Sequence, residues 1–127
     1  MISITLKIWS LINIIFFIGL GIVVLIKHQG IASHLNYEFS TNTGLIEFKA
    51  TYGGLMLALG VSLAYLLYKE HFILLALFIT VLYFGFGLGR LLSTITHQGW
   101  NTQVLTYLAT EILGGLLSLW LWWKITH

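Results

Sequence analysis

Four long apolar runs are the feature that most constrains this chain. They cover residues 8–26, 45–67, 72–92 and 104–123. A helix rises about 1.5 Å per residue, so each run is long enough to cross the ~30 Å hydrocarbon layer of a membrane. Backbone within lipid must satisfy its own hydrogen bonds, which favours helices over isolated strands. We therefore expect an all-α integral membrane protein, a four-helix bundle of up-down-up-down topology that forms a single domain over residues 1–127.

The composition agrees with a membrane protein. Of 127 residues, 58% are hydrophobic and only 8% are charged. A soluble domain carries about a quarter charged residues, so this chain could not cover a surface that faces water everywhere. The absence of cysteine excludes disulfides and thiolate metal sites. The net charge of +2 comes from few ionisable groups and gives no reason to expect a nucleic-acid partner.

The first apolar run can also be interpreted as a signal peptide, because Lys7 precedes it and small residues follow it. Its apolar core is longer than the roughly 7–15 residues of a signal peptide, so we expect a retained anchor. Lys69-Glu70-His71 leaves room only for a tight turn between the second and third spans.

Charges near the ends of the spans bear on the orientation of the protein in the membrane. One face has Lys7, Lys69 and Lys124, and Lys27, Lys49 and Arg90 fall toward the other, which is a tie by simple counting. If Lys49 and Arg90 are buried in a site, they do not count as loop charges. The remaining lysines then favour both termini in the cytoplasm.

Four charged residues inside or beside the apolar runs are the most informative. They are Glu47, Lys49, Arg90 and Glu111. A charge at the bilayer centre costs about 2.5–3.5 kcal/mol on insertion scales. Because successive spans alternate in direction, all four residues approach the membrane face opposite the termini. Two acids and two bases make a neutral set, and Arg90 could bind Glu111 or Glu47 through a bidentate fork.

Small and hydroxyl-bearing residues share helix faces with these charges. Tyr52, Gly53 and Gly54 lie beside Glu47 on the second span. Glycines let membrane helices approach closely, and a tyrosine can donate to a buried carboxylate. The pattern predicts a polar pocket near one end of the bundle. Its candidate ligand-binding residues are Glu47, Lys49, Tyr52, Gly53, Gly54, Arg90 and Glu111.

Each charge also has a purely structural interpretation. Glu47 follows Gly44 by three residues and could be a first-turn acid favoured by the helix dipole. Lys49 and Arg90 could extend to the membrane interface. Glu111 is too short to do so, and its alternative role is a buried ion pair that sets helix register.

The sequence contains no sign of catalytic chemistry. The histidines lack a tight metal-ligand spacing such as H-x-x-x-H, and none lies deep within a span. Neither a phosphate-binding glycine loop nor a nucleophile elbow is present. We therefore expect no catalytic residues, no metal and no cofactor.

Three motifs in order resemble a known family. Glu47-x4-Tyr52-Gly53-Gly54, then Gly89-Arg90-Leu91-x-Ser93, then a lone Glu111 in the fourth span, resemble small four-helix bacterial inner-membrane proteins of unknown function, the AciT-like envelope proteins. The motifs extend over nearly the whole chain. The family more often has arginine where this chain has Lys49. The resemblance implies a multi-pass protein of the bacterial inner membrane that helps to maintain the cell envelope.

These observations support more than one function. The first hypothesis is a non-enzymatic inner-membrane protein that supports the envelope permeability barrier and binds a lipid head group or a partner protein at its Glu/Arg pocket. The alternative is a small proton-coupled transporter that uses Glu111. An enzyme with Glu47 and Glu111 as an acid/base pair is a third hypothesis, although no nucleophile, metal or redox centre supports it. Expected partners are membrane lipid, an inner-membrane or envelope protein, and a second copy in a homodimer formed through small-residue faces.

Overall fold

The computed structural model describes residues Met1–His127 and contains helices but no β-strands. Four segments are long and apolar enough to cross a membrane: Ile2–Ile26, Asn42–Tyr68, Phe72–His97 and Thr102–Thr126. The prediction of an all-α membrane protein with four spans is therefore confirmed. The elements in chain order are α1 (Ile2–Ile26), α2 (His28–His34), α3 (Asn42–Phe48), the π-helix η1 (Lys49–Leu55), α4 (Met56–Tyr68), α5 (Phe72–His97) and α6 (Thr102–Thr126).

The helices extend beyond the apolar runs because polar residues complete their ends. Thr41 caps α3 by accepting a hydrogen bond from Gly44 N, and Asn101 caps α6 by accepting one from Val104 N. Since α3 begins at Asn42, Glu47 lies in its second turn. The interpretation of Glu47 as a first-turn acid is therefore wrong.

Threonines extend α5 beyond the predicted end of the third span at residue 92. The Thr94 hydroxyl donates to the Arg90 carbonyl at 2.6 Å, and the Thr96 hydroxyl donates to the Leu92 carbonyl at 2.8 Å. Each hydroxyl satisfies its donor within the helix, so a polar sequence can continue a helix that hydropathy alone would end.

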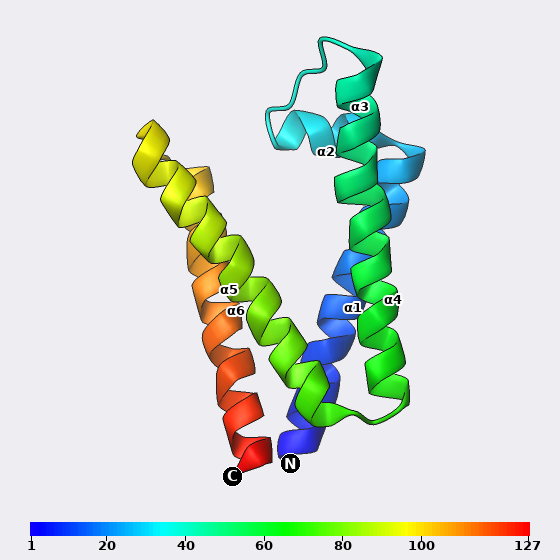
Figure 1. Ribbon diagram of the computed structural model, residues 1–127, viewed down its shortest axis with the longest axis vertical. Helices are drawn as coiled ribbons and strands as arrows, with labels where there is room; N and C mark the ends of the chain where they lie inside the picture. Colours follow the sequence, from blue (N-terminus) through cyan, green and yellow to red (C-terminus); the bar gives the residue numbers. More distant parts are fainter. The chain divides into compact units, whose positions relative to one another are not determined.

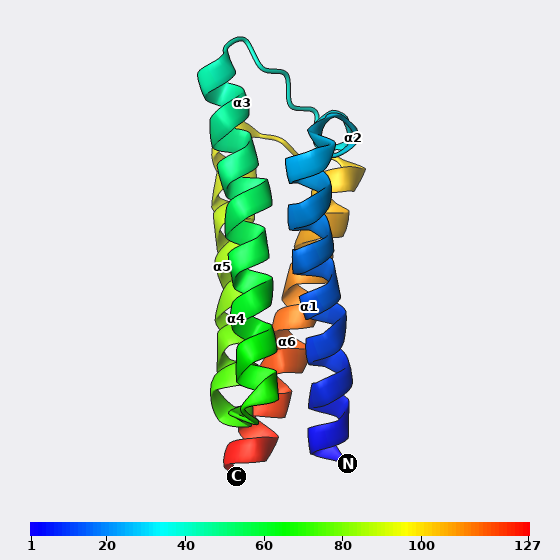
Figure 2. The same ribbon diagram turned by 90° about the vertical axis from the view of Figure 1, so that its right-hand side faces the viewer.

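The chain divides into two compact units. The first unit is Ile8–Tyr68 and the second combines Met1–Lys7 with Lys69–His127. In the first unit, α3, η1 and α4 form one continuous rod beside α1 (Figure 2). A Cβ atom on Gly21 would lie 2.7 Å from the Gly53 carbonyl oxygen, and one on Gly60 would lie 3.0 Å from the Ile18 backbone nitrogen. Glycine therefore brings backbone against backbone in this unit.

The π-helix η1 lies in the middle of this rod and contains Tyr52, Gly53 and Gly54. The chain has no proline, so no proline kink accounts for this change in the helix. A π-helix has one more residue per hydrogen-bonded turn and occurs mostly in short stretches. Gly53 lacks a side chain at the point where α1 approaches this wider helix, whereas Gly54 borders open space.

Aromatic rings gather where α2 and the following loop meet α3 and η1. Ring centroids of Tyr37 and Phe48 are 4.9 Å apart, those of Phe39 and Phe48 are 5.1 Å apart, and those of Phe48 and Tyr52 are 4.9 Å apart. These four residues, Tyr37, Phe39, Phe48 and Tyr52, are called the aromatic cluster below. They pack beside a small apolar core that includes Val24 and Ala32.

The second unit is a helical hairpin of α5 and α6, coloured green-yellow and orange-red in Figure 1. Aromatic rings fill the space above glycines here: a Cβ on Gly114 would lie 2.4 Å from the Tyr83 ring, and one on Gly115 would lie 2.8 Å from the Phe84 ring. Glycine therefore brings ring against backbone in this unit, in contrast to the first.

The ends of the second unit are defined by two turns. Residues 69–71 form the predicted tight turn, in which Glu70 takes a left-handed φ of 57°, and residues 98–101 join α5 to α6. The Lys7 ammonium lies 5.6 Å from the centroid of the Phe72 ring, so the N-terminal residues pack at the start of α5. Because α6 runs back along α5, both termini lie at the same end of this unit (Figure 1).

Candidate functional site

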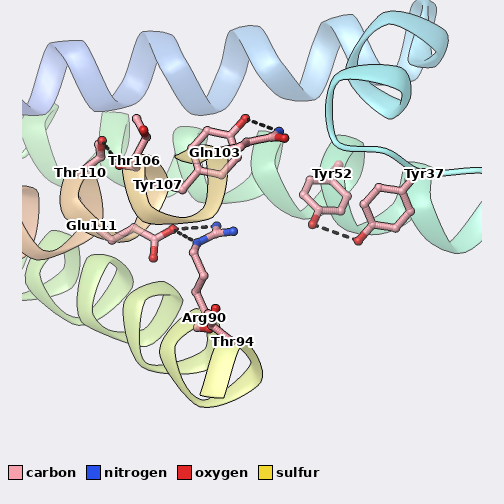
Figure 3. Close-up of polar contacts among 9 residues, drawn as sticks. All are labelled: Tyr37, Tyr52, Arg90, Thr94, Gln103, Thr106, Tyr107, Thr110 and Glu111. Atoms are coloured by element: carbon pink, nitrogen blue, oxygen red, sulfur yellow. Dashed lines mark hydrogen bonds and ion pairs between the residues drawn. The ribbon is translucent and has the colours of Figure 1, made fainter. Parts of the chain in front are cut away.

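An ion pair joins the two helices of the second unit. The Arg90 side chain extends from α5 toward Glu111 on α6 (Figure 3). Arg90 Nε donates to Glu111 Oε1 at 2.7 Å, and Arg90 Nη2 lies 2.7 Å from the same oxygen. Of the two acids that the sequence left open as partners of Arg90, Glu111 and Glu47, the structure pairs it with Glu111. The pairing differs from the expected bidentate fork, because both nitrogens contact a single oxygen of the carboxylate.

The two members of the pair differ in exposure. Glu111 is buried, with 8% of its surface accessible, whereas about a third (34%) of the Arg90 side chain is accessible. The guanidinium carbon also lies 5.1 Å from the centroid of the Tyr107 ring, which is one turn before Glu111 on α6. A cation over a tyrosine face is stabilised by the ring's quadrupole. Glu111 and Tyr107 thus hold the guanidinium, and its remaining edge stays accessible.

Arg90 retains hydrogen-bonding capacity that the protein does not use. A guanidinium has five N–H donors, and two of them are directed to Glu111 Oε1. The other three have no partner in the protein. These donors are available to a polar group from outside the protein.

The second carboxylate oxygen of Glu111 is also unpaired. Oε2 is buried and has no hydrogen-bond partner. It faces Gly87 on α5, where a Cβ would lie 3.6 Å from it. The absence of a side chain at Gly87 leaves room for the carboxylate between the helices. Glu111 therefore links α6 to α5 through Arg90, and a role of this pair in setting helix register stays a prediction.

An open groove of about 530 Å³ runs past Arg90 on the surface of this hairpin. It follows one face of α5 and ends at the turn between the helices. Small or apolar residues line the end of the groove farthest from this turn. Arg90 lies in the middle, and hydroxyl and imidazole groups line the end nearest the turn. Its lining includes Gly85, Phe86, Gly89, Arg90, Ser93 and His97.

The other five predicted site residues belong to the first unit. Glu47 is exposed on α3, Lys49 is half-buried as the first residue of η1, and the Tyr52 hydroxyl lies 3.3 Å from that of Tyr37. Gly53 is buried against Leu25, and Gly54 borders open space. The expected gathering of all four charges in one pocket stays a prediction.

The sequence interpretation missed two groups of residues. The aromatic cluster was signalled only by Phe48 and Tyr52, which are four residues apart and so share a helix face. His97 lines the groove seven residues after Arg90, a spacing of two helical turns that could have placed both on one face. No group of three or more histidine or acidic side chains is arranged to hold a metal ion.

The fold and the site together define a class of protein. It is a helical, multi-pass membrane protein with an ion pair inside one of its hairpins. Within this class, the chain belongs to the family defined by the domain of unknown function DUF4345, whose model matches residues 5–122. No curated protein matches the chain. No solved structure matches it either.

Proposed function

We propose that this protein is a non-enzymatic component of the bacterial inner membrane that supports the permeability barrier of the cell envelope. In this proposal Arg90 binds a polar group of a lipid or of a partner protein, and Glu111 holds Arg90 in position. The observation that carries the proposal is the one-sided ion pair, in which three guanidinium donors remain beside an open groove. The inner-membrane location and the envelope role are supported by the resemblance to AciT-like proteins.

The proposal is tested by replacing the ion pair with a neutral pair of similar size. In cells that depend on the protein, the double variant R90Q/E111Q is expected to insert normally and to increase uptake of a hydrophobic fluorescent dye. The matched control is E70Q, which removes a carboxylate from the exposed turn before α5. Unchanged dye uptake in R90Q/E111Q, at normal protein levels, would show that the pair is only architectural.

A second candidate function is a small proton-coupled transporter, favoured by the unpaired Oε2 of Glu111. A buried carboxylate oxygen without a hydrogen-bond donor can accept a proton, and such groups occur in membrane proton pathways. Proteoliposomes with an imposed pH gradient test this function. Substrate uptake that follows the gradient and disappears in E111Q would favour transport, and gradient-independent uptake would exclude it.

A further inference from the structure

The groove beside Arg90 changes in polarity along its length. Its lining residues on α5 span Gly85 to His97, which is about 18 Å along a helix. Gly85, Phe86 and Gly89 lie at the deeper end, then Arg90, and then Ser93 and His97 toward the turn. Along α5 toward the turn, the lining of the groove therefore changes from apolar to cationic and then to polar. A membrane phospholipid presents the same order from its acyl chain to its phosphate and its head group.

The deeper part of the groove exists because two glycines lack side chains. A Cβ on Gly85 or on Gly89 would have no atom of the protein within 4 Å. Both glycines therefore border open space, in contrast to Gly87 between them, which faces Glu111. A leucine at position 89 would fill the groove and would not contact Glu111, the ionic partner of Arg90.

The charges of the groove favour an anion. None of its lining residues is acidic, and Glu111 is buried behind the guanidinium. The three remaining N–H donors of Arg90 match the oxygens of a phosphate, to which guanidinium groups form charge-assisted hydrogen bonds. The Ser93 hydroxyl, one turn farther along the same face, adds a neutral donor.

We propose that this groove is a binding site for an anionic phospholipid, with the phosphate at Arg90 and one acyl chain along Gly85, Phe86 and Gly89. The inference rests on the proposed function, since it names the group that Arg90 holds. It commits to a lipid and not to a free phosphate ion, because the apolar part of the groove would otherwise remain empty.

The test measures lipid retained by the purified full-length protein in detergent, by native mass spectrometry after addition of phosphatidylglycerol or phosphatidylcholine. Wild type is expected to retain phosphatidylglycerol about tenfold better, because phosphatidylcholine carries the same phosphate but adds a choline cation that Arg90 repels. G89L fills the groove and leaves the ion pair intact, so it should lose this retention. The matched control is G19L, since Gly19 of α1 is another glycine at which an added Cβ would meet no atom within 4 Å.

Several results would overturn the proposal. Equal retention of the two lipids by wild type would show that the groove does not select a lipid of net negative charge. Unchanged retention by G89L, with G19L also unchanged, would show that the acyl chain does not occupy the groove. Inorganic phosphate that stabilises wild type and G89L equally against heat, with no preference for phosphatidylglycerol, would identify a free-ion site. Any of these results combined with increased dye uptake in R90Q/E111Q would retain the proposed envelope function and exclude an anionic phospholipid site in the groove.

Discussion

The two units of this protein bring membrane helices together in different ways. In the first unit, glycines let α1 meet the backbone of η1 and α4, and an aromatic cluster packs at one end. In the second unit, aromatic rings of α5 fill the space over glycines of α6, and a partly buried ion pair joins the helices. Backbone atoms can move away only with their helix, whereas a ring can rotate. We therefore expect the first unit to be the less tolerant of added volume and the second the less tolerant of lost charge.

The largest expected effect is the loss of the acid at position 111. E111A leaves Arg90 without its ionic partner inside the hairpin, which should lower the free energy of unfolding by about 3 kcal/mol. The matched change in the first unit is E47A, which removes an exposed carboxylate and should cost less than about 0.5 kcal/mol. Unfolding in mixed micelles, followed by circular dichroism, measures both.

Equal losses in E111A and E47A would break the comparison. They would favour the predicted arrangement in which both acids and both bases neutralise one another. A double-mutant cycle between Arg90 and Glu111 adds a direct value for the pair itself.

The second prediction adds a single methyl group to the first unit. G21A places a Cβ 2.7 Å from the Gly53 carbonyl oxygen and 2.8 Å from the Leu57 backbone nitrogen. Because both are backbone atoms, the helices must separate, at a cost of about 2 kcal/mol. Thermal unfolding in detergent measures the loss. G19A, with no atom within 4 Å of its Cβ, is the control and should be neutral.

The smallest of the three effects is expected for G114A in the second unit. The added Cβ would lie 2.4 Å from the Tyr83 ring, so it must displace a side chain instead of a backbone. Rotation of the ring should limit the loss to about 1 kcal/mol in the same thermal assay. A loss larger than that of G21A would contradict the distinction between ring and backbone contacts.

Much of the architecture is predictable from sequence because hydropathy directly indicates which segments can lie within a membrane. All four spans and the turn at residues 69–71 follow from apolar runs and the charged residues between them. The helix ends are less predictable: Asn42, Thr102 and the segment from Ser93 to His97 are polar, yet they are helical. The preceding side chains of Thr41 and Asn101 cap the helix starts, and the Thr94 and Thr96 hydroxyls bond within α5, effects that a hydropathy average does not contain.

The candidate site was predictable only in part. Charges at Arg90 and Glu111 are conspicuous inside apolar runs. Opposite charges at the same depth in the membrane favour an ion pair. The number of Glu111 carboxylate oxygens that contact Arg90 depends on the distance between α5 and α6. Gly87 and the contact between Tyr83 and Gly114 set this distance. Such distances arise from packing between helices and leave no signature in the spacing of residues along one helix.

The amino-acid sequence by itself determined that this chain forms four membrane-spanning helices and carries opposite charges within them, because lipid imposes length, polarity and hydrogen bonding on each segment separately. Only the tertiary structure decided that η1 is a π-helix beside Gly21, that Arg90 and Glu111 meet through one oxygen, and that a groove remains beside them. These features depend on how closely neighbouring helices approach, and that distance is a property of their joint packing.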